Sequence, residues 1–281
     1  MSEKLAIPGR VKEISSLSNP IVKDLRLLEK KRHREDTNRF VAEGMKLVID
    51  ALDLGWSLDT LIYAASKRGD AKIGGLAAKA LAKGADILIV PEKVLGAITR
   101  RDNPQMVVGV FKRRFAKASA VTDGSGDVWV ALDRVRDPGN LGTVIRTIDA
   151  VGAKGVILIG DTTDPFSPET VRATMGSIFG VNIIRMAAED FASFANTWSG
   201  RIVGTHMAGE TDFRNVDYGG GPTILLMGNE QQGLTDALVE ACTDVVRIPQ
   251  AGRADSLNLA VATAICLYEA KRESLALEPI G

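Results

Sequence analysis

The second half of the chain alternates short apolar segments with amphipathic ones, and this alternation constrains the fold more than any other feature. Strands that are rich in Val, Ile and Leu and alternate with helices are typical of a parallel β-sheet covered on both faces. We therefore predict an α/β domain with a parallel sheet over residues 127–281, ending in a long helix from residue 256 to about 274. Its six predicted strands are residues 128–133, 155–160, 181–186, 201–207, 223–227 and 244–249.

The first half shows a similar alternation and predicts a second, smaller α/β domain. Residues 113–127 are basic and rich in small residues with no hydrophobic period, which is typical of a linker. We place the first domain at residues 1–115, the linker at 116–126 and the second domain at 127–281. In the first domain we expect helices at residues 19–36, 45–55, 74–84 and 92–100, and strands at 39–44, 58–64, 85–90 and 105–113.

The composition is that of a globular protein, with 45% hydrophobic and 25% charged residues. No apolar run approaches the roughly 20 residues that span a bilayer, and the N-terminus lacks the pattern of a secretory signal. Cys242 and Cys266 lie in apolar contexts, which favours two buried thiols over a disulfide. We expect a cytoplasmic protein that does not associate with a membrane.

The net charge of zero conceals an asymmetry between the two halves. Residues 1–120 contain 23 Lys and Arg against 14 Asp and Glu, whereas the remainder contains 12 against 21. A basic first half favours contact with a polyanion, most plausibly nucleic acid. For the segment KKRHRED at residues 30–36, the alternative is an ordinary solvated helix face.

Several classes of chemistry are disfavoured by residues that the chain lacks. His33 and His206 are its two histidines, so catalytic triads and zinc sites with several His or Cys ligands lose their basis, and we expect no metal. Neither a GxGxxG fingerprint after a first strand nor a GxxxxGK[ST] loop occurs. A nucleotide-dependent oxidoreductase, the alternative from another enzyme class, is therefore poorly supported.

Three loops of the second half each follow an apolar strand and carry more polar residues and glycines than a turn requires. In the first, Asn140 can cap a helix that begins near Leu141, and Arg146 lies where a guanidinium could bind a phosphate. A surface arginine on an amphipathic helix is the alternative for Arg146. Singly, such loops have little specificity.

The second loop, MGNEQQG, contains Gly228, Asn229, Glu230 and Gly233. It follows the buried strand 223–227, and ligands of parallel sheets bind outside the carboxyl ends of the strands. The third loop begins at Ile248-Pro249 and leads into the final helix through Ser256, Leu257 and Asn258.

Together, in this order, the motifs resemble the SpoU (TrmH-type) RNA 2′-O-ribose methyltransferases of the SPOUT superfamily. The Asn-x-Gly-x-x-x-Arg motif matches Asn140, Gly142 and Arg146, and the apolar-Gly-Asn-Glu-x-x-Gly motif matches residues 227–233. The Ile-Pro-Met-x-Gly and Ser-Leu-Asn motif matches residues 248–262, with Gln250 where methionine is common. Residues 1–115 are similar to the ribosomal-protein-like substrate-binding domain of many members.

The resemblance implies a deep trefoil knot in the C-terminal domain and S-adenosylmethionine as the cofactor, bound in that knot. It assigns catalytic positions to Arg146, Asn140, Glu230, Ser256 and Asn258. It also implies that the catalytic domains form a homodimer. The implied cofactor-binding positions are Thr205, His206, Leu226, Gly228, Asn229, Gly233, Ile248, Ser256 and Leu257.

The implied function is transfer of a methyl group from S-adenosylmethionine to a ribose 2′-hydroxyl of structured RNA. The separate basic domain favours rRNA over tRNA. A tRNA 2′-O-methyltransferase, or a non-catalytic RNA-binding protein with the same fold, is the alternative.

Overall fold

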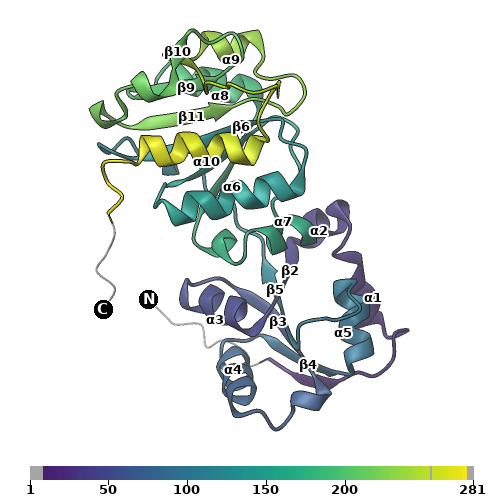
Figure 1. Cartoon of the computed structure of the whole chain (residues 1–281). Coiled ribbons are helices and arrows are strands. Elements are labelled where there is room, and N and C mark those ends of the chain that lie inside the picture. The colour runs from purple at the N-terminus through teal and green to yellow at the C-terminus, as the bar shows by residue number, and fades with distance from the viewer. Residues whose placement is uncertain (1–8, 254, 277–281) are drawn as a thin grey trace. The chain divides into compact units, whose positions relative to one another are not determined.

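The computed structural model describes residues 9–253 and 255–276, which form two compact units (Figure 1). The N-terminal unit contains the chain up to Arg113 together with residues 166–179, and the C-terminal unit contains the remainder. Residues 1–8, at which we expect no secretory signal, lie outside the described residues. The predicted domain boundaries stay a prediction about which parts fold independently.

A five-stranded mixed sheet forms the centre of the N-terminal unit. Its strands are β1 (Val11–Glu13), β2 (Arg39–Glu43), β3 (Leu58–Ala64), β4 (Asp86–Val90) and β5 (Val107–Lys112). They lie in the order β1-β4-β3-β5-β2, and β5 runs antiparallel to both of its neighbours. The four predicted strands are present. The strand β1 was not predicted, because its three residues, Val-Lys-Glu, are too few to show a hydrophobic period.

The helices of this unit are α1 (Pro20–Leu27), α2 (Lys31–Thr37), α3 (Met45–Asp53), α4 (Ala71–Ala82) and α5 (Glu92–Thr99). The predicted single helix over residues 19–36 is wrong, because α1 and α2 are separate. Leu28 is buried in the core between them, and the Arg34 guanidinium donates to the carbonyls of Leu28 and Glu29 at 2.8 and 2.6 Å. These side-chain bonds satisfy carbonyls that the interrupted helix leaves open.

The segment 166–179 packs within the N-terminal unit although it lies between two strands of the C-terminal sheet in sequence. Phe166 and Phe179 contact the ring of Phe40, with centroids 4.7 and 6.1 Å away. The Trp56 indole donates to the carbonyl of Phe179 at 2.8 Å. The helix α7 (Pro168–Ala173) of this segment is short, and Met175, two residues beyond its end, adopts a left-handed conformation with φ of 52°.

A seven-stranded sheet forms the centre of the C-terminal unit, and every strand pair in it is parallel. This confirms the predicted fold class and all six predicted strands. Only the two-residue strand β10 was not predicted, and the implied knot stays a prediction. In spatial order the strands are β10 (Thr211–Asp212), β12 (Asp244–Arg247), β9 (Arg201–Thr205), β11 (Thr223–Met227), β6 (Val128–Asp133), β7 (Gly155–Ile159) and β8 (Asn182–Met186).

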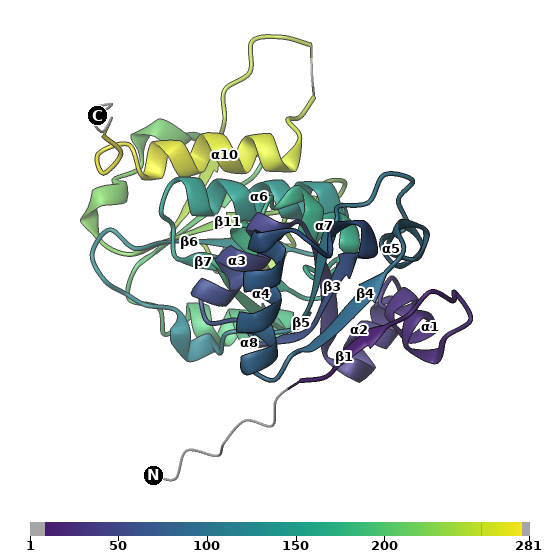
Figure 2. The ribbon, with the colours of Figure 1, turned by 90° about the horizontal axis from the view of Figure 1, so that it is seen from below.

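Helices cover both faces of this sheet. The helices α6 (Pro138–Ala150) and α10 (Leu259–Ala270) lie side by side on one face, and α8 (Ala188–Ala195) lies on the other (Figure 2). On the α8 face, Phe191 packs with Trp129 and Ile157 in a buried cluster that also contains Leu238 of α9 (Asp236–Glu240). The final helix begins at Leu259 instead of residue 256, because the Asn258 side chain caps it by accepting from Ala260 and Val261.

None of the described helices is both long enough and apolar enough to cross a bilayer. The two cysteines are free, as expected; Cys266 is buried and Cys242 is half-buried. Burial raises the pKa of Cys242 to about 11 and that of Cys266 to about 12. Both thiols therefore stay protonated in the folded protein at neutral and mildly alkaline pH.

We expect native protein at pH 8 to react with a thiol reagent such as dithionitrobenzoate on the order of 100-fold more slowly than unfolded protein. An unfolded thiol, with a pKa of about 8.5, is roughly a quarter ionised at pH 8, and the thiolate is the reactive form. The absorbance change should report two thiols per chain after denaturation. Rapid reaction of either thiol in native protein would contradict this burial.

Candidate functional site

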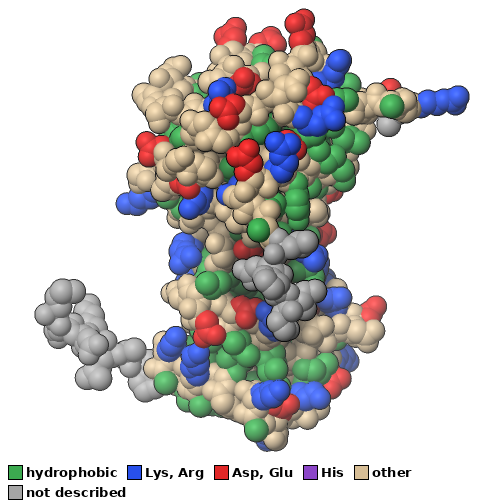
Figure 3. All heavy atoms as spheres, turned by 60° about the vertical axis from the view of Figure 1, so that its left-hand side comes forward, with side chains coloured by type: hydrophobic (Ala, Val, Ile, Leu, Met, Phe, Trp, Pro, Cys, Tyr) green, Lys and Arg blue, Asp and Glu red, His purple; other side chains and the backbone are tan. Residues whose placement is uncertain are grey.

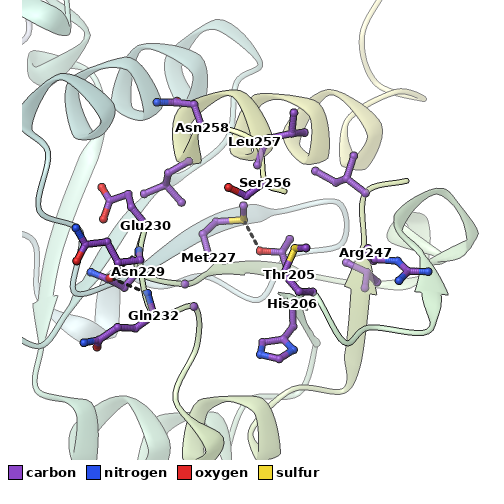
Figure 4. Close-up of a pocket in the computed structure, with 18 of the residues that line it drawn as sticks. Thr205, His206, Met227, Asn229, Glu230, Gln232, Arg247, Ser256, Leu257 and Asn258 are labelled. Atoms are coloured by element: carbon purple, nitrogen blue, oxygen red, sulfur yellow. Dashed lines mark hydrogen bonds between the residues drawn. The ribbon is translucent and has the colours of Figure 1, made fainter. Parts of the chain in front are cut away.

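A pocket of about 550 Å³ lies at the carboxyl ends of β9, β11 and β12 (Figure 4). Its wall consists of the ends of these three strands, the loops that follow them, Asn140 of α6, and Leu259 and Ala262 of α10. Parallel strands place their following loops at one sheet edge, so segments distant in sequence converge here. Its lining includes the predicted residues Asn140, Thr205, His206, Gly228, Asn229, Glu230, Gly233, Ile248, Ser256, Leu257 and Asn258.

Two predicted residues do not line this pocket. Leu226 is fully buried inside β11, and its neighbour Met227 lines the pocket instead. Arg146 is exposed on α6, six residues beyond Asn140. No hydrogen bond or ion pair of its side chain occurs among the residues that the structure describes, so its guanidinium faces solvent in a single chain.

The loop after β11 closes on itself through backbone hydrogen bonds. The amide of Asn229 donates to the carbonyl of Gly233 at 3.1 Å, and the amide of Gly233 donates back at 2.9 Å. A Cβ on Gly228 would lie 2.4 Å from the carbonyl carbon of Gly233. Gly233 has a φ of 67°, which favours glycine. The two glycines are thus required by the closure of the loop itself, in addition to any ligand it admits.

Asn140 joins the three motifs through its side-chain amide. Its Nδ2 donates to Oε1 of Glu230 at 3.3 Å, and its Oδ1 accepts from Nδ2 of Asn258 at 2.9 Å. The predicted capping role is wrong: α6 begins at Pro138, and Asp137 caps it by accepting from the amide of Asn140. Because Asp137 performs the capping, the Asn140 side chain is available for the other two loops.

The carboxylate of Glu230 lies at the N-terminus of α6. It accepts from the amides of Arg136 and Asp137, each at 3.4 Å, as well as from Asn140. A negative charge at a helix N-terminus is stabilised by the unpaired amides and the helix dipole. The loop after β11 is thus attached to the start of α6.

Asp133 and Arg134, which are not among the predicted site residues, support the same loop. Arg134 makes a two-point ion pair with buried Asp133, and this hydrogen bonding raises the pKa of the guanidinium. Arg134 also donates to Oε1 of Gln232 at 2.8 Å, while its carbonyl accepts from the Asn229 side chain at 2.9 Å. An acidic residue at the end of an apolar strand can be recognised in the sequence, so Asp133 could have been predicted. The left-handed φ of 49° at Arg134 could not.

The lining suits an organic ligand of moderate size that carries both polar and apolar groups. Apolar side chains of Met227, Ile248 and Leu257 face the pocket together with the amide of Asn229 and the hydroxyl of Ser256. Thr205 donates its hydroxyl hydrogen to the sulfur of Met227 at 3.6 Å, which Figure 4 shows as a dashed line. The volume is within the roughly 300–1,000 Å³ of small-molecule pockets. Among the described residues, no group of three or more His, Cys, Asp or Glu could hold a metal ion.

Comparison with known proteins assigns the family. Residues 127–268 match the SpoU rRNA methylase family, and residues 19–109 match the MRM3-like substrate binding domain. The chain belongs to the SpoU rRNA methylase family, which confirms the resemblance inferred from the motifs.

Relatives are similar over nearly the whole chain. A 23S rRNA (uridine(2479)-2′-O)-methyltransferase from Streptomyces viridochromogenes is 31% identical, covering 89% of this chain and 88% of that protein. A 23S rRNA (guanosine(2553)-2′-O)-methyltransferase from Bacillus subtilis is 30% identical, covering 92% and 98%. The crystal structure of an AdoMet-bound rRNA methyltransferase from Sinorhizobium meliloti has a TM-score of 0.90 at 56% identity, covering 95% of this chain and 99% of that one.

The closed loop after β11 leads to a prediction about Gly228. Gly228→Ala should lower the free energy of unfolding by about 1–3 kcal/mol, because the added methyl group overlaps backbone atoms that cannot move without opening the loop. Gly252→Ala is the matched control: it lies in the loop after β12, and its added Cβ would meet nothing within 4 Å. Chemical denaturation followed by circular dichroism measures both, and equal stability of the two variants would refute the overlap.

Proposed function

We propose that this protein transfers a methyl group from S-adenosylmethionine to a ribose 2′-hydroxyl of RNA. It is an S-adenosylmethionine-dependent RNA 2′-O-methyltransferase. The observation that carries the proposal is the convergence of three family motifs on one pocket, where Asn140 bonds both Glu230 and Asn258. The AdoMet-bound neighbour, at 56% identity, supports the choice of cofactor.

The chemistry needs alignment more than it needs acid–base groups. S-adenosylmethionine supplies an already activated methyl group. The protein must hold the ribose hydroxyl in line with that group and stabilise the charge that develops on the oxygen. Asn229, Ser256 and Leu257, with the backbone of the three loops, would hold the cofactor, while Asn140, Glu230 and Asn258 would keep the loops in register.

Arg146 is the residue we assign to the RNA. A guanidinium stays protonated at neutral pH and cannot act as a base there. We therefore assign it to clamping the phosphate beside the target ribose and to stabilising the developing alkoxide, with the proton passing to phosphate or water. Its exposure on α6 leaves it accessible to RNA.

Arg146 does not line the pocket of its own chain. In a homodimer, it would reach the pocket of the second copy. The helix α10 is apolar on all sides, and a helix of this kind is normally covered on more than one face. Val261, Ile265 and Tyr268 form a stripe along it, and Val261 and Tyr268 are 49% and 55% exposed. Hydrophobic side chains, coloured green, are visible on the right-hand side of the C-terminal unit in Figure 3. We propose that this stripe meets its equivalent in a second copy.

We propose rRNA as the substrate, in preference to tRNA. Curated relatives that match almost end to end are named as 23S rRNA 2′-O-methyltransferases. The N-terminal segment that matches a substrate binding domain lies in the basic half of the chain. The free thiols and the RNA substrate are consistent with a cytoplasmic location.

Arg146→Ala should reduce methyl transfer by at least about 100-fold, as expected when charge stabilisation in the transition state is lost. The assay transfers labelled methyl from S-adenosylmethionine to unmodified 23S rRNA, 16S rRNA and tRNA transcripts, and to ribosomal subunits that lack the modification. The melting-temperature increase with S-adenosylhomocysteine should persist in the variant. Arg214→Ala, which removes an exposed arginine paired with Asp212, is the control. Unchanged turnover in Arg146→Ala would remove this residue from the mechanism.

Mixing variants tests whether Arg146 serves the partner's pocket. Co-expression of Arg146→Ala with Gly228→Ala should restore activity, because one pocket of each heterodimer would combine an intact loop with an intact arginine. The mixed preparation should recover up to about a quarter of wild-type turnover if half of the dimers are mixed and one of their two sites works. If both variants are inactive alone and stay inactive when mixed, Arg146 acts on its own chain's pocket.

A further inference from the structure

A second cleft, of about 1090 Å³, lies within the N-terminal unit and has no part in the reaction described above. The ends of β2 and α5, the start of α3, and α7 form it, and all of its lining residues belong to this unit. Four cationic side chains line it, namely Lys46, Arg100, Arg101 and Arg172, together with the three acidic side chains of Glu29, Glu43 and Glu169. We call it the Glu43 cleft, after the buried carboxylate at which two of these arginines meet.

Glu43 holds Arg101 and Arg172 from opposite ends of its carboxylate. Nη1 of Arg172 lies 3.4 Å from Oε1, and Nη1 of Arg101 lies 3.7 Å from Oε2. The glutamate side chain is 7% exposed, whereas those of Arg101 and Arg172 are 44% and 37% exposed. The Oε2 atom has no hydrogen-bond partner among the described residues.

A buried carboxylate with an incompletely satisfied oxygen is costly, and ion pairs of this kind often contribute little to stability. What the arrangement of Glu43 with Arg101 and Arg172 determines is the position of the two guanidinium groups. Arg101 follows α5 and Arg172 lies on α7, so one carboxylate brings together guanidinium groups from segments 71 positions apart in the sequence.

The two arginines retain the capacity to bind an anion. A guanidinium has five N–H donors in a planar fork that matches a phosphate, and the contacts to Glu43 use Nη1 of each. Arg100, held in a left-handed conformation and paired with Glu29 at 2.6 Å, adds a third guanidinium to the same cleft. The cleft therefore has the donors for a phosphate group.

The size and the lining of the cleft indicate a ligand larger than a single ion. Met45, Leu47 and Met175 line the cleft beside the arginines, and Met175 is 65% exposed. A single-stranded nucleic acid presents phosphates and unstacked bases to a protein, and its binding sites combine cationic groups with apolar platforms. The cleft offers both within one unit.

We propose that the Glu43 cleft binds a single-stranded segment of RNA, with one phosphate between Arg101 and Arg172 and the adjoining nucleoside against Met45, Leu47 and Met175. This proposal rests on the proposed function, because it takes RNA to be the substrate. Glu43 is then a positioning residue that holds the two arginines in place. The RNA then binds to the residues of the Glu43 cleft, none of which lines the pocket for the methyl donor.

The test is binding of a fluorescein-labelled 12-nucleotide oligouridine to the full chain, followed by fluorescence anisotropy at several salt concentrations. The main variant combines Glu43→Gln, Arg101→Gln and Arg172→Gln, so that no buried charge is left unpaired. We expect at least 10-fold weaker binding and a salt slope smaller by about 0.7, the value for one phosphate contact of a single strand. Arg68→Gln is the matched control, because it removes one net positive charge from the same unit at an exposed ion pair with Glu13.

A second variant, Arg101→Lys with Arg172→Lys, protects the test against misfolding of the first. It keeps both charges beside Glu43 and loses the planar fork, so binding should weaken about threefold or more with an unchanged salt slope. Folding of every variant is checked by its melting temperature and by the shift with S-adenosylhomocysteine.

Three results would overturn the proposal: no binding of oligouridine by the wild type, affinity of the folded triple variant within twofold of wild type, or an equal loss in Arg68→Gln. Failure of the proposed function is distinguishable from these results. A wild-type protein that binds oligouridine through the cleft but transfers no methyl group to any RNA would contradict the methyltransferase assignment and support the cleft.

Discussion

The site depends first on the parallel pairing of β11 with both of its neighbours. Residues Thr223–Met227 pair in register with β6, and the same strand pairs with β9 up to Gly204. Strands that are parallel and in register end at one edge, so the loops that follow them emerge together. All five residues of β11 are buried, and a shift of the register by one residue would turn every side chain to the other face. The hydrophobic core therefore fixes the position at which the loops meet.

Short polar contacts then determine how the loops fit together. Asn140 is the shared partner of Glu230 and Asn258, and the Asp133–Arg134 pair supports the same loop from the β6 side. A hydrogen bond of this kind contributes on the order of 1 kcal/mol, which is small beside the burial of a strand. The sheet thus provides the stability, and the amide and carboxylate groups provide the geometry at which a ligand can be aligned.

The sequence predicted those parts of the molecule that depend on periodic burial. The six predicted strands of the larger sheet, out of its seven, and the convergence of their loops follow from apolar segments that alternate with helices. Features that depend on a single backbone angle or a long-range side-chain bond were not readable. Arg34 bonds the carbonyls five and six residues before it, where the predicted helix is interrupted, and Asp137 takes the capping position expected for Asn140. Gly228 lines the pocket, and the contact that requires a glycine there is with Gly233, on the same loop.

The segment 166–179 shows why domain boundaries are difficult to read from composition. It follows β7 and precedes β8 in sequence, and its helix start at Pro168 is indistinguishable from that of a helix covering the larger sheet. Its partners are instead Phe40, Trp56 and Phe111 of the N-terminal unit. A fragment containing residues 114–281 alone would expose Phe166 and Phe179, which are both buried in the whole chain. Because the same segment supplies Arg172 to the Glu43 cleft, that fragment would also separate this arginine from the carboxylate that positions it.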